Sequence, residues 1–164
     1  MIIYLLRQWV IILIYPTAYG YNRLNREIKG VIIMISTKGR YAIRVMLDLA
    51  KNDNGNYIPL KDIAERQEIS KKYLEIIVKE MVTGGLVKGA SGKGGGYKLL
   101  RKPEEYTIGE ILDLMEITMS SVACLADNGY ECPRMEKCET LPMWKEFDEM
   151  VHDFFYGRTL KDIM

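Results

Sequence analysis

The stretch "IPLKDIAERQEISKKYLEIIVKEMV", residues 58–82, decides the fold of this chain. It contains two short helical patterns, "LKDIAERQ" and "KKYLEIIVKEMV", and each keeps its apolar residues on one face. Only "EIS", residues 68–70, separates them, so the two helices must cross closely, with the small side chain of Ala64 at the crossing. Ile69 is expected to fill the turn, and Ser70 to cap the second helix. The stretch therefore predicts a helix-turn-helix.

A further helix and a hairpin flank this pair. Tyr41, Val45 and Leu49 recur at helical spacing, and the turn cluster "NDNGN" at 52–56 ends that helix. On the other side, "LVKGASGKGGGYKLLRK", residues 86–102, is typical of two short strands around a glycine-rich loop. A hairpin in this place forms the wing of a winged helix-turn-helix, so we predict a mainly α fold.

Side chains at the start of the second helix and on the hairpin form the predicted DNA interface. A recognition helix contacts bases with its N-terminal residues, and glycines in the hairpin let the backbone approach phosphates or enter the minor groove. Glu75 could accept a hydrogen bond from a cytosine amino group or exclude other sequences. The predicted DNA-binding residues are Arg40, Ser70, Lys71, Lys72, Tyr73, Glu75, Lys79, Ser91, Lys93, Gly94, Gly95 and Tyr97.

Charge is distributed unevenly along the chain and supports this interpretation. Residues 34–102 carry 14 Lys and Arg against 7 Asp and Glu, whereas residues 103–164 carry 5 against 14. A basic middle favours contact with a polyanion, and an acidic end does not. The alternative is an ordinary helical hairpin with a basic, solvated surface. Nucleotide binding is excluded because the glycine-rich loop does not match the phosphate-binding loop of nucleotide-binding proteins.

The first 33 residues differ in character from the rest. The opening "MIIYLLRQWVIILIY" is apolar but short for a membrane span, which needs about 20 residues, and it lacks the basic leader of a signal peptide. Clear helical patterning begins only at Met34. We therefore expect residues 1–33 to be an N-terminal extension outside the native domain, with translation starting at Met34 and no membrane partner. The alternative is a membrane-surface or packing helix at residues 2–15.

The three cysteines, Cys124, Cys132 and Cys138, all lie within residues 124–138. An odd number without an evident signal peptide disfavours a disulfide framework and favours a cytoplasmic chain that uses thiolates for metal or redox chemistry. The gaps lack the close spacing of a structural zinc site, and wide gaps on a flexible loop suit an iron–sulfur cluster. The alternative is three redox-sensitive or zinc-binding thiols.

A helix is expected to follow the cysteines, with Pro142 in its first turn. Apolar residues then recur at nearly heptad spacing, and this aromatic stripe on a small acidic appendage favours a partner helix from a second copy. The stripe is Leu141, Trp144, Phe147, Val151 and Phe154, of which the last four are the predicted dimerisation residues. The alternative is a core stripe within one chain. A two-fold homodimer would present two recognition helices to a near-palindromic operator in double-stranded DNA.

Several motifs together resemble the Rrf2 family of bacterial transcription regulators. They are "MISTKGRYAIRVMLDLA", the helix-turn-helix stretch, "GLVKGASGKGGGYKL", "YTIGEILDLME", the cysteine cluster with its aromatic helix, and "TLKDIM". The resemblance covers residues 34–164 and implies a homodimeric winged helix-turn-helix, in many members with an iron–sulfur cluster between the DNA-binding domain and a dimerisation helix. Three cysteines at about this spacing bind a 2Fe–2S cluster in regulators of iron–sulfur biogenesis, and a similar trio binds a 4Fe–4S cluster in nitric-oxide sensors. We expect 2Fe–2S.

The fourth cluster ligand departs from the family's patterns. The biogenesis regulators use a histidine three residues after the last cysteine, and here that position is Leu141. The nitric-oxide sensors use an aspartate near the start of the first helix, and here Arg40 stands there. Glu139, next to the last cysteine, and His152, the only histidine, are the candidates. The alternative for His152 is a polar surface residue.

The sequence therefore predicts a regulator and not an enzyme, since it shows no nucleophile–base pattern and no cofactor-binding fingerprint. Residues 34–102 would form the DNA-binding domain, and residues 103–164 the connecting helix, the cluster-binding loop and the dimerisation helix. The cluster would sense iron–sulfur, redox or nitric oxide status and set operator affinity, in a repressor or dual regulator. The alternatives are a cluster-free regulator of cysteine or sulfur metabolism that uses thiols or a partner protein, and an iron–sulfur electron-transfer protein.

Overall fold

The computed structural model describes residues 35–126 and 131–164. Our prediction about the extension 1–33 and a start at Met34 lies outside these ranges. Within them, no helix is long and apolar enough to cross a membrane.

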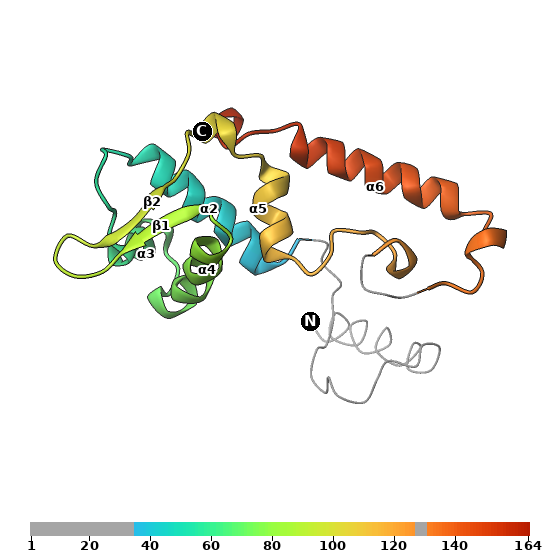
Figure 1. The fold of residues 1–164 in the computed structure, drawn as a ribbon, viewed down its shortest axis with the longest axis horizontal. Coiled ribbons are helices and arrows are strands. Elements are labelled where there is room, and N and C mark those ends of the chain that lie inside the picture. The colour runs from blue at the N-terminus through green and yellow to red at the C-terminus, as the bar shows by residue number, and fades with distance from the viewer. Residues whose placement is uncertain (1–34, 127–130) are drawn as a thin grey trace, which may run out of the picture. The chain divides into compact units, whose positions relative to one another are not determined.

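Helices are the main regular structure of the described chain, and their order is the predicted one (Figure 1). The helices are α2 (Thr37–Lys51), α3 (Leu60–Gln67), α4 (Lys71–Thr83), α5 (Ile108–Met115) and α6 (Leu141–Tyr156), and the strands are β1 (Val87–Ala90) and β2 (Gly96–Leu99). Single 3-10 turns are η2 (Pro103–Glu105), η3 (Ala123–Leu125), η4 (Met135–Lys137) and η5 (Lys161–Ile163). The predicted mainly α fold is confirmed.

Polar caps set where the helices of the DNA-binding half begin. The Ser36 Oγ accepts a hydrogen bond from the Gly39 N–H at 3.0 Å, and the Ser70 Oγ accepts one from the Tyr73 N–H at 3.3 Å. Thr107 caps α5 in the same way. Each cap satisfies an N–H that has no partner within its own helix. The cap at Ser70 confirms the predicted start of the second helix.

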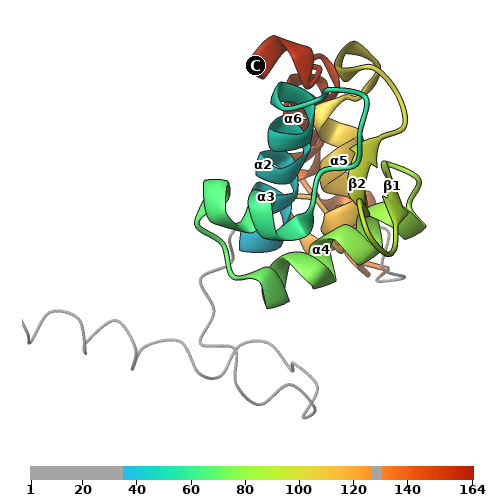
Figure 2. The ribbon, with the colours of Figure 1, turned by 90° about the vertical axis from the view of Figure 1, so that its left-hand side faces the viewer.

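One hydrophobic core holds α2 to α5 and the hairpin together. Each helix contributes the apolar stripe that its spacing predicts. The helical core residues are Ala42, Val45, Met46, Leu49, Leu60, Ile63, Leu74, Ile77, Val78, Met81, Ile108, Ile111, Leu112 and Met115. Ile69 is buried in the turn, as predicted. Figure 2 shows α4 below α2 and α3 with the hairpin beside it, so among the described residues α4 is packed on one side only.

A buried carboxylate on α2 fixes the position of α3. Asp48 is only 3% exposed. Arg66 donates to its two oxygens, from Nη2 at 2.6 Å and from Nε at 3.0 Å, and Gln67 Nε2 donates a third hydrogen bond at 2.9 Å. The hydrogen bond to Asp48 raises the pKa of Arg66. Because a buried charge is tolerated only when it is paired, these bonds specify one placement of the two helices.

The hairpin is fixed at its base by a third short pairing. β1 and β2 are antiparallel, with Val87 opposite Leu99. Ile58, just before α3, exchanges two main-chain hydrogen bonds of 2.9 Å with Tyr97. Gly96 has a φ of +156°, and a Cβ atom there would overlap the carbonyl of Ile58. Glycine is therefore required for this close approach.

α6 contains no fully buried residue, and its apolar side chains divide into two stripes. Trp144 and Val151 are half-buried. The exposed stripe is Met143, Phe147, Met150 and Phe154. The predicted dimerisation residues therefore come from both stripes, and two methionines complete the exposed one.

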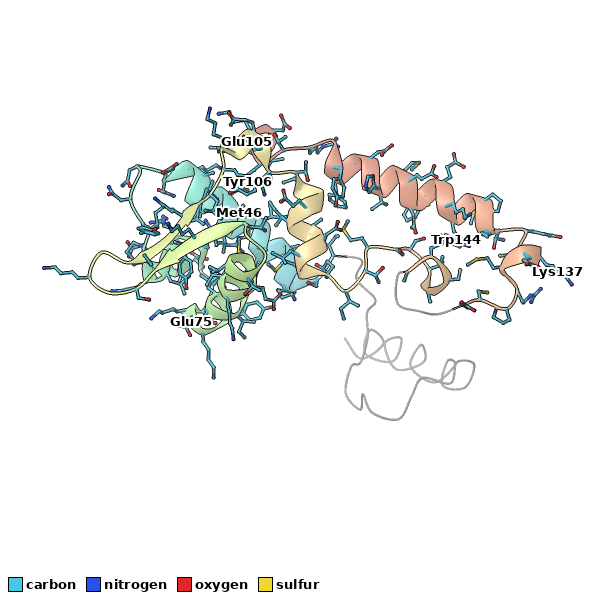
Figure 3. The ribbon with its side chains drawn as sticks, in the orientation of Figure 1. Met46, Glu75, Glu105, Tyr106, Lys137 and Trp144 are labelled. Atoms are coloured by element: carbon cyan, nitrogen blue, oxygen red, sulfur yellow. The ribbon has the colours of Figure 1, made fainter. Side chains whose placement is uncertain are left out.

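Tyr106 ties the ends of the hairpin to α5. Its ring is fully buried. The hydroxyl donates to the Leu86 carbonyl at 2.8 Å and accepts from the N–H groups of Leu100 at 2.9 Å and Arg101 at 2.8 Å. Figure 3 shows Tyr106 between the hairpin and α5. One hydroxyl thus satisfies three main-chain groups, and the wing leaves the core at a fixed angle.

We predict that Tyr106→Phe lowers the free energy of unfolding by about 1–3 kcal/mol, because it leaves the buried Leu86 carbonyl and two partly buried N–H groups without their partner. Chemical denaturation followed by circular dichroism measures the change. Tyr57→Phe is the matched control and should shift stability by less than about 0.5 kcal/mol, since the Tyr57 ring is only half-buried beside Lys98. Equal stability of wild type and Tyr106→Phe would contradict this role.

Candidate nucleic-acid interface and cysteine segment

The outer face of α4 carries the predicted recognition residues. Lys71, Lys72, Glu75 and Lys79 are all exposed, while the buried stripe of α4 lies on the opposite side. Figure 3 shows Glu75 on the outer side of α4, away from Met46 and Tyr106. Lysines around a helix start add to the positive end of the helix dipole, and this arrangement attracts phosphate.

Glu75 is paired with a neighbouring lysine in this structure. Its Oε1 lies 3.7 Å from Lys71 Nζ, one turn away on the same helix, and both side chains are more than half exposed. An exposed pair of this kind contributes little to stability. The ion pair can therefore break at little cost, so that Lys71 or Glu75 binds a group on DNA instead.

Tyr73 is held in place by two residues that sequence analysis did not name as part of the interface. Its ring meets the ring of Tyr41 edge to face, with centroids 5.8 Å apart. The guanidinium of Arg44 lies 5.2 Å from the centre of the Tyr41 ring. It donates two hydrogen bonds to Gln67, one from Nη2 to the main-chain carbonyl oxygen and one from Nε to Oε1 at 3.1 Å. This stack orients Tyr73 and secures the turn before α4.

The tip of the wing is glycine-rich and basic, as predicted. Ser91, Lys93 and Gly94 are exposed, and Gly95 is half-buried. Tyr97 is half-buried with its ring against Gly89, and its main chain pairs with Ile58, so this predicted DNA-binding residue also has a structural role.

Arg40 lies on the first turn of α2. It is exposed, and its Nη2 donates to Thr37 Oγ1 at 3.1 Å.

The three cysteines are free thiols and all are partly exposed. Cys124 lies in η3, Cys138 ends η4, and Cys132 lies between them. Thr140 Oγ1 is 3.5 Å from Cys138 Sγ, and this side-chain hydrogen bond, with that of the Thr140 backbone, lowers the pKa of Cys138. In the described ranges, no three His, Cys, Asp or Glu side chains gather closely enough to hold a metal ion.

The two candidates for a fourth ligand lie in different places. Glu139 is exposed and directly follows Cys138. His152 lies eleven residues into α6, about 16 Å along the helix axis from its start. The His152 ring stacks on Tyr156 at 4.3 Å, and its Nδ1 lies 3.4 Å from Asp153 Oδ1. The structure therefore places Glu139 beside the cysteine segment and His152 beyond it.

Comparison with known proteins shows the family. The model of the Rrf2 family, described as an iron-dependent transcriptional regulator, matches residues 35–164. The chain belongs to the Rrf2 family.

Curated relatives of this Rrf2 chain are named HTH-type transcriptional regulator IscR. That of Aliivibrio salmonicida is 34% identical over 130 residues, which cover 79% of this chain and 76% of the relative. That of Escherichia coli is 33% identical and covers 79% of each. Relatives with these names make the chain a DNA-binding regulator of transcription and not an enzyme, so the electron-transfer alternative is set aside.

Solved structures confirm the winged helix-turn-helix fold. CymR of B. subtilis, described as the global cysteine regulator, has a TM-score of 0.64 and 32% identity, covering 80% of this chain and 96% of that one. IscR of T. potens has a TM-score of 0.60 and 29% identity, covering 79% and 84%. The Rrf2 chain therefore resembles proteins of both names.

In this Rrf2 protein the chain at the C-terminal end of α6 is attached to α5 and to Tyr106 just before it. The Ile108 N–H donates to the Arg158 carbonyl at 2.8 Å, and the Leu160 N–H donates to the Tyr106 carbonyl at 2.8 Å. Gly109 lies against the Tyr156 ring, where a Cβ atom would overlap it. The Tyr156 hydroxyl also donates to Asp113 on α5, and this hydrogen bond raises the pKa of Tyr156 to about 12.

We predict that Tyr156 is a late-titrating tyrosine. Because its pKa is raised in the folded state, its contribution to stability is present below pH 10 and is lost as the pH rises from about 10 to about 12. Absorbance titration of tyrosinate in wild type and Tyr156→Phe should differ by one group titrating near pH 12.

Asp113→Asn is the companion variant, because it keeps an oxygen acceptor but removes the charge. This variant should move the pKa of Tyr156 back toward the ordinary value of a tyrosine. Identical titration curves for wild type and Tyr156→Phe in this range would show that the hydroxyl is not bound to Asp113.

Proposed function

We propose that this Rrf2 protein is a homodimeric repressor or dual regulator whose operator affinity is set by an iron–sulfur cluster bound by Cys124, Cys132 and Cys138. The observation that carries the proposal is the set of three free, partly exposed thiols on one short segment between α5 and α6. The relatives named IscR and the iron-dependent description of the family model support it.

The donors fit such a cluster in their chemistry. Thiolates are soft ligands that bind iron–sulfur clusters, and the lowered pKa of Cys138 favours its thiolate form. Glu139 is the proposed fourth ligand, since it adjoins Cys138 and is exposed. We propose a 2Fe–2S cluster, which would supply a group sensitive to iron–sulfur, redox or nitric oxide status.

Glu116 gives the cysteine segment a route to the DNA-binding half. It is the first residue after α5, and its Oε1 accepts hydrogen bonds from the Ser36 N–H at 2.9 Å and the Ser36 Oγ at 2.8 Å. In the first turn of α2, Lys38 pairs with Glu80 of α4 at 2.9 Å. A change of order in the segment after Glu116 therefore reaches the recognition helix through α2, with a coupling of about 1–3 kcal/mol.

The exposed stripe of α6 supports the proposal of a homodimer. Met143, Phe147, Met150 and Phe154 are spaced four, three and four residues apart, which is the heptad pattern of paired helices. Two copies joined along this stripe would present two α4 helices to a near-palindromic operator.

A second candidate is a cluster-free regulator of cysteine or sulfur metabolism. The likeness to B. subtilis CymR, described as a global cysteine regulator, favours it. In that case the same thiols or a partner protein would carry the signal.

Anaerobic purification of the full chain tests the two candidates. We expect visible absorption with about two iron and two sulfide per chain. Replacing any one of the three cysteines by serine should remove the iron, the sulfide and the visible absorption and leave the helical content unchanged. Glu136→Gln, an exposed control within the same segment, should keep them. A colourless, iron-free dimer that still binds DNA would favour the cluster-free regulator.

The dimer is tested by changing the exposed stripe. We expect the wild type to sediment at about twice the 18.9 kDa chain mass. Met150→Glu should shift it toward the monomer and weaken operator binding, because it places a charge in the apolar seam. Lys145→Gln, an exposed position on the opposite side of the same helix, should not. A monomeric wild type would contradict the proposal.

A further inference from the structure

Ile76 is a large apolar side chain on the outer face of the recognition helix. It is 50% exposed. Lys72 lies one turn before it and Lys79 one turn after it, both exposed on the same face. The buried stripe of α4 lies on the opposite side, so Ile76 lies near the centre of the surface that faces away from the core.

Nothing in the described part of the chain accounts for an isoleucine here. Ile76 is not among the side chains packed against the hydrophobic core. A β-branched residue is also a poorer helix former than the lysine or glutamate that usually fills an exposed helical position. The side chain therefore costs helix stability without packing against the core of the described residues.

The neighbouring charges indicate what this side chain meets. Lys72 and Lys79 flank it along the helix, and lysines in these places contact phosphates on the walls of a groove. An α-helix fits the major groove, and the one apolar group on the base edges there is the C5-methyl of thymine. Glu75, next to Ile76, is a polar group for a neighbouring base.

We propose that Ile76 is a specificity-determining residue that recognises the C5-methyl group of a thymine in each half-site of the operator. The inference rests on the sequence-specific DNA binding of the proposed function. Burial of one methyl group against an aliphatic side chain contributes roughly fourfold in affinity. Two half-sites bound together give roughly fifteenfold.

The test begins with duplexes selected by the full-length protein from a random-sequence pool. Each thymine of the selected site is then replaced by deoxyuridine, which removes the methyl group and leaves base pairing unchanged. At one thymine position per half-site, we expect the wild type to lose roughly fourfold in affinity for each replacement. Ile76→Ala removes the side chain from both half-sites of the dimer, so it should bind the thymine duplex roughly fifteenfold more weakly and should be insensitive to uracil at that position.

Val82→Ala is the matched control. Val82 is also an exposed aliphatic residue on α4, but it lies six residues, about 9 Å, farther toward the C-terminal end. This variant should keep the full sensitivity to uracil. A wild type that binds uracil equally well at every position would overturn the inference, and so would an Ile76→Ala variant that keeps the sensitivity. Failure to enrich any sequence would instead count against the proposed function.

Discussion

The buried carboxylate of Asp48 is the constraint on which the DNA-binding half depends. A carboxylate so fully removed from water is costly unless it is paired, and Arg66 and Gln67 reach it only at one placement of α3 against α2. α3 ends at Gln67 and the turn into α4 follows directly, so the recognition helix takes its position from this pair. Arg44 also binds Gln67, and the same contact thereby orders the rings beside α4.

Opposite charge in the two parts of the chain matches their different tasks. Basic residues surround α4 and the hairpin, where phosphates release counterions on binding. Residues 103–164 carry 14 of the 22 acidic residues, and these are repelled by the same phosphates. This distribution of charge would favour an approach to DNA with α4 and the hairpin first.

Local features were predictable from the sequence, and long-range ones were not. The starts of α2 and α4 follow from Ser36 and Ser70, whose caps act within three residues. Asp48 gave no signal, because Arg66 and Gln67 are distant in sequence, and Tyr106 gave none, because the carbonyl to which it donates is 20 residues away. On α6, Trp144 and Phe147 are both aromatic, and the sequence alone does not separate them. The structure shows that Trp144 is half-buried within the chain and Phe147 is exposed. Ile76 was missed for the same reason.

The attachment of α6 has a mechanical consequence. The chain leaves α5 at Glu116, continues through the cysteines and α6, and reaches Tyr156, which contacts Gly109 and Asp113 of α5. The intervening chain is thus a closed ring with both ends fastened to one short helix. If one part of this ring became shorter, the rest of the ring would have to extend, or the ring would pull on α5. The eight residues of α5 are packed in the core beside α2, so a force on either end of α5 would be passed to the first helix of the winged helix-turn-helix.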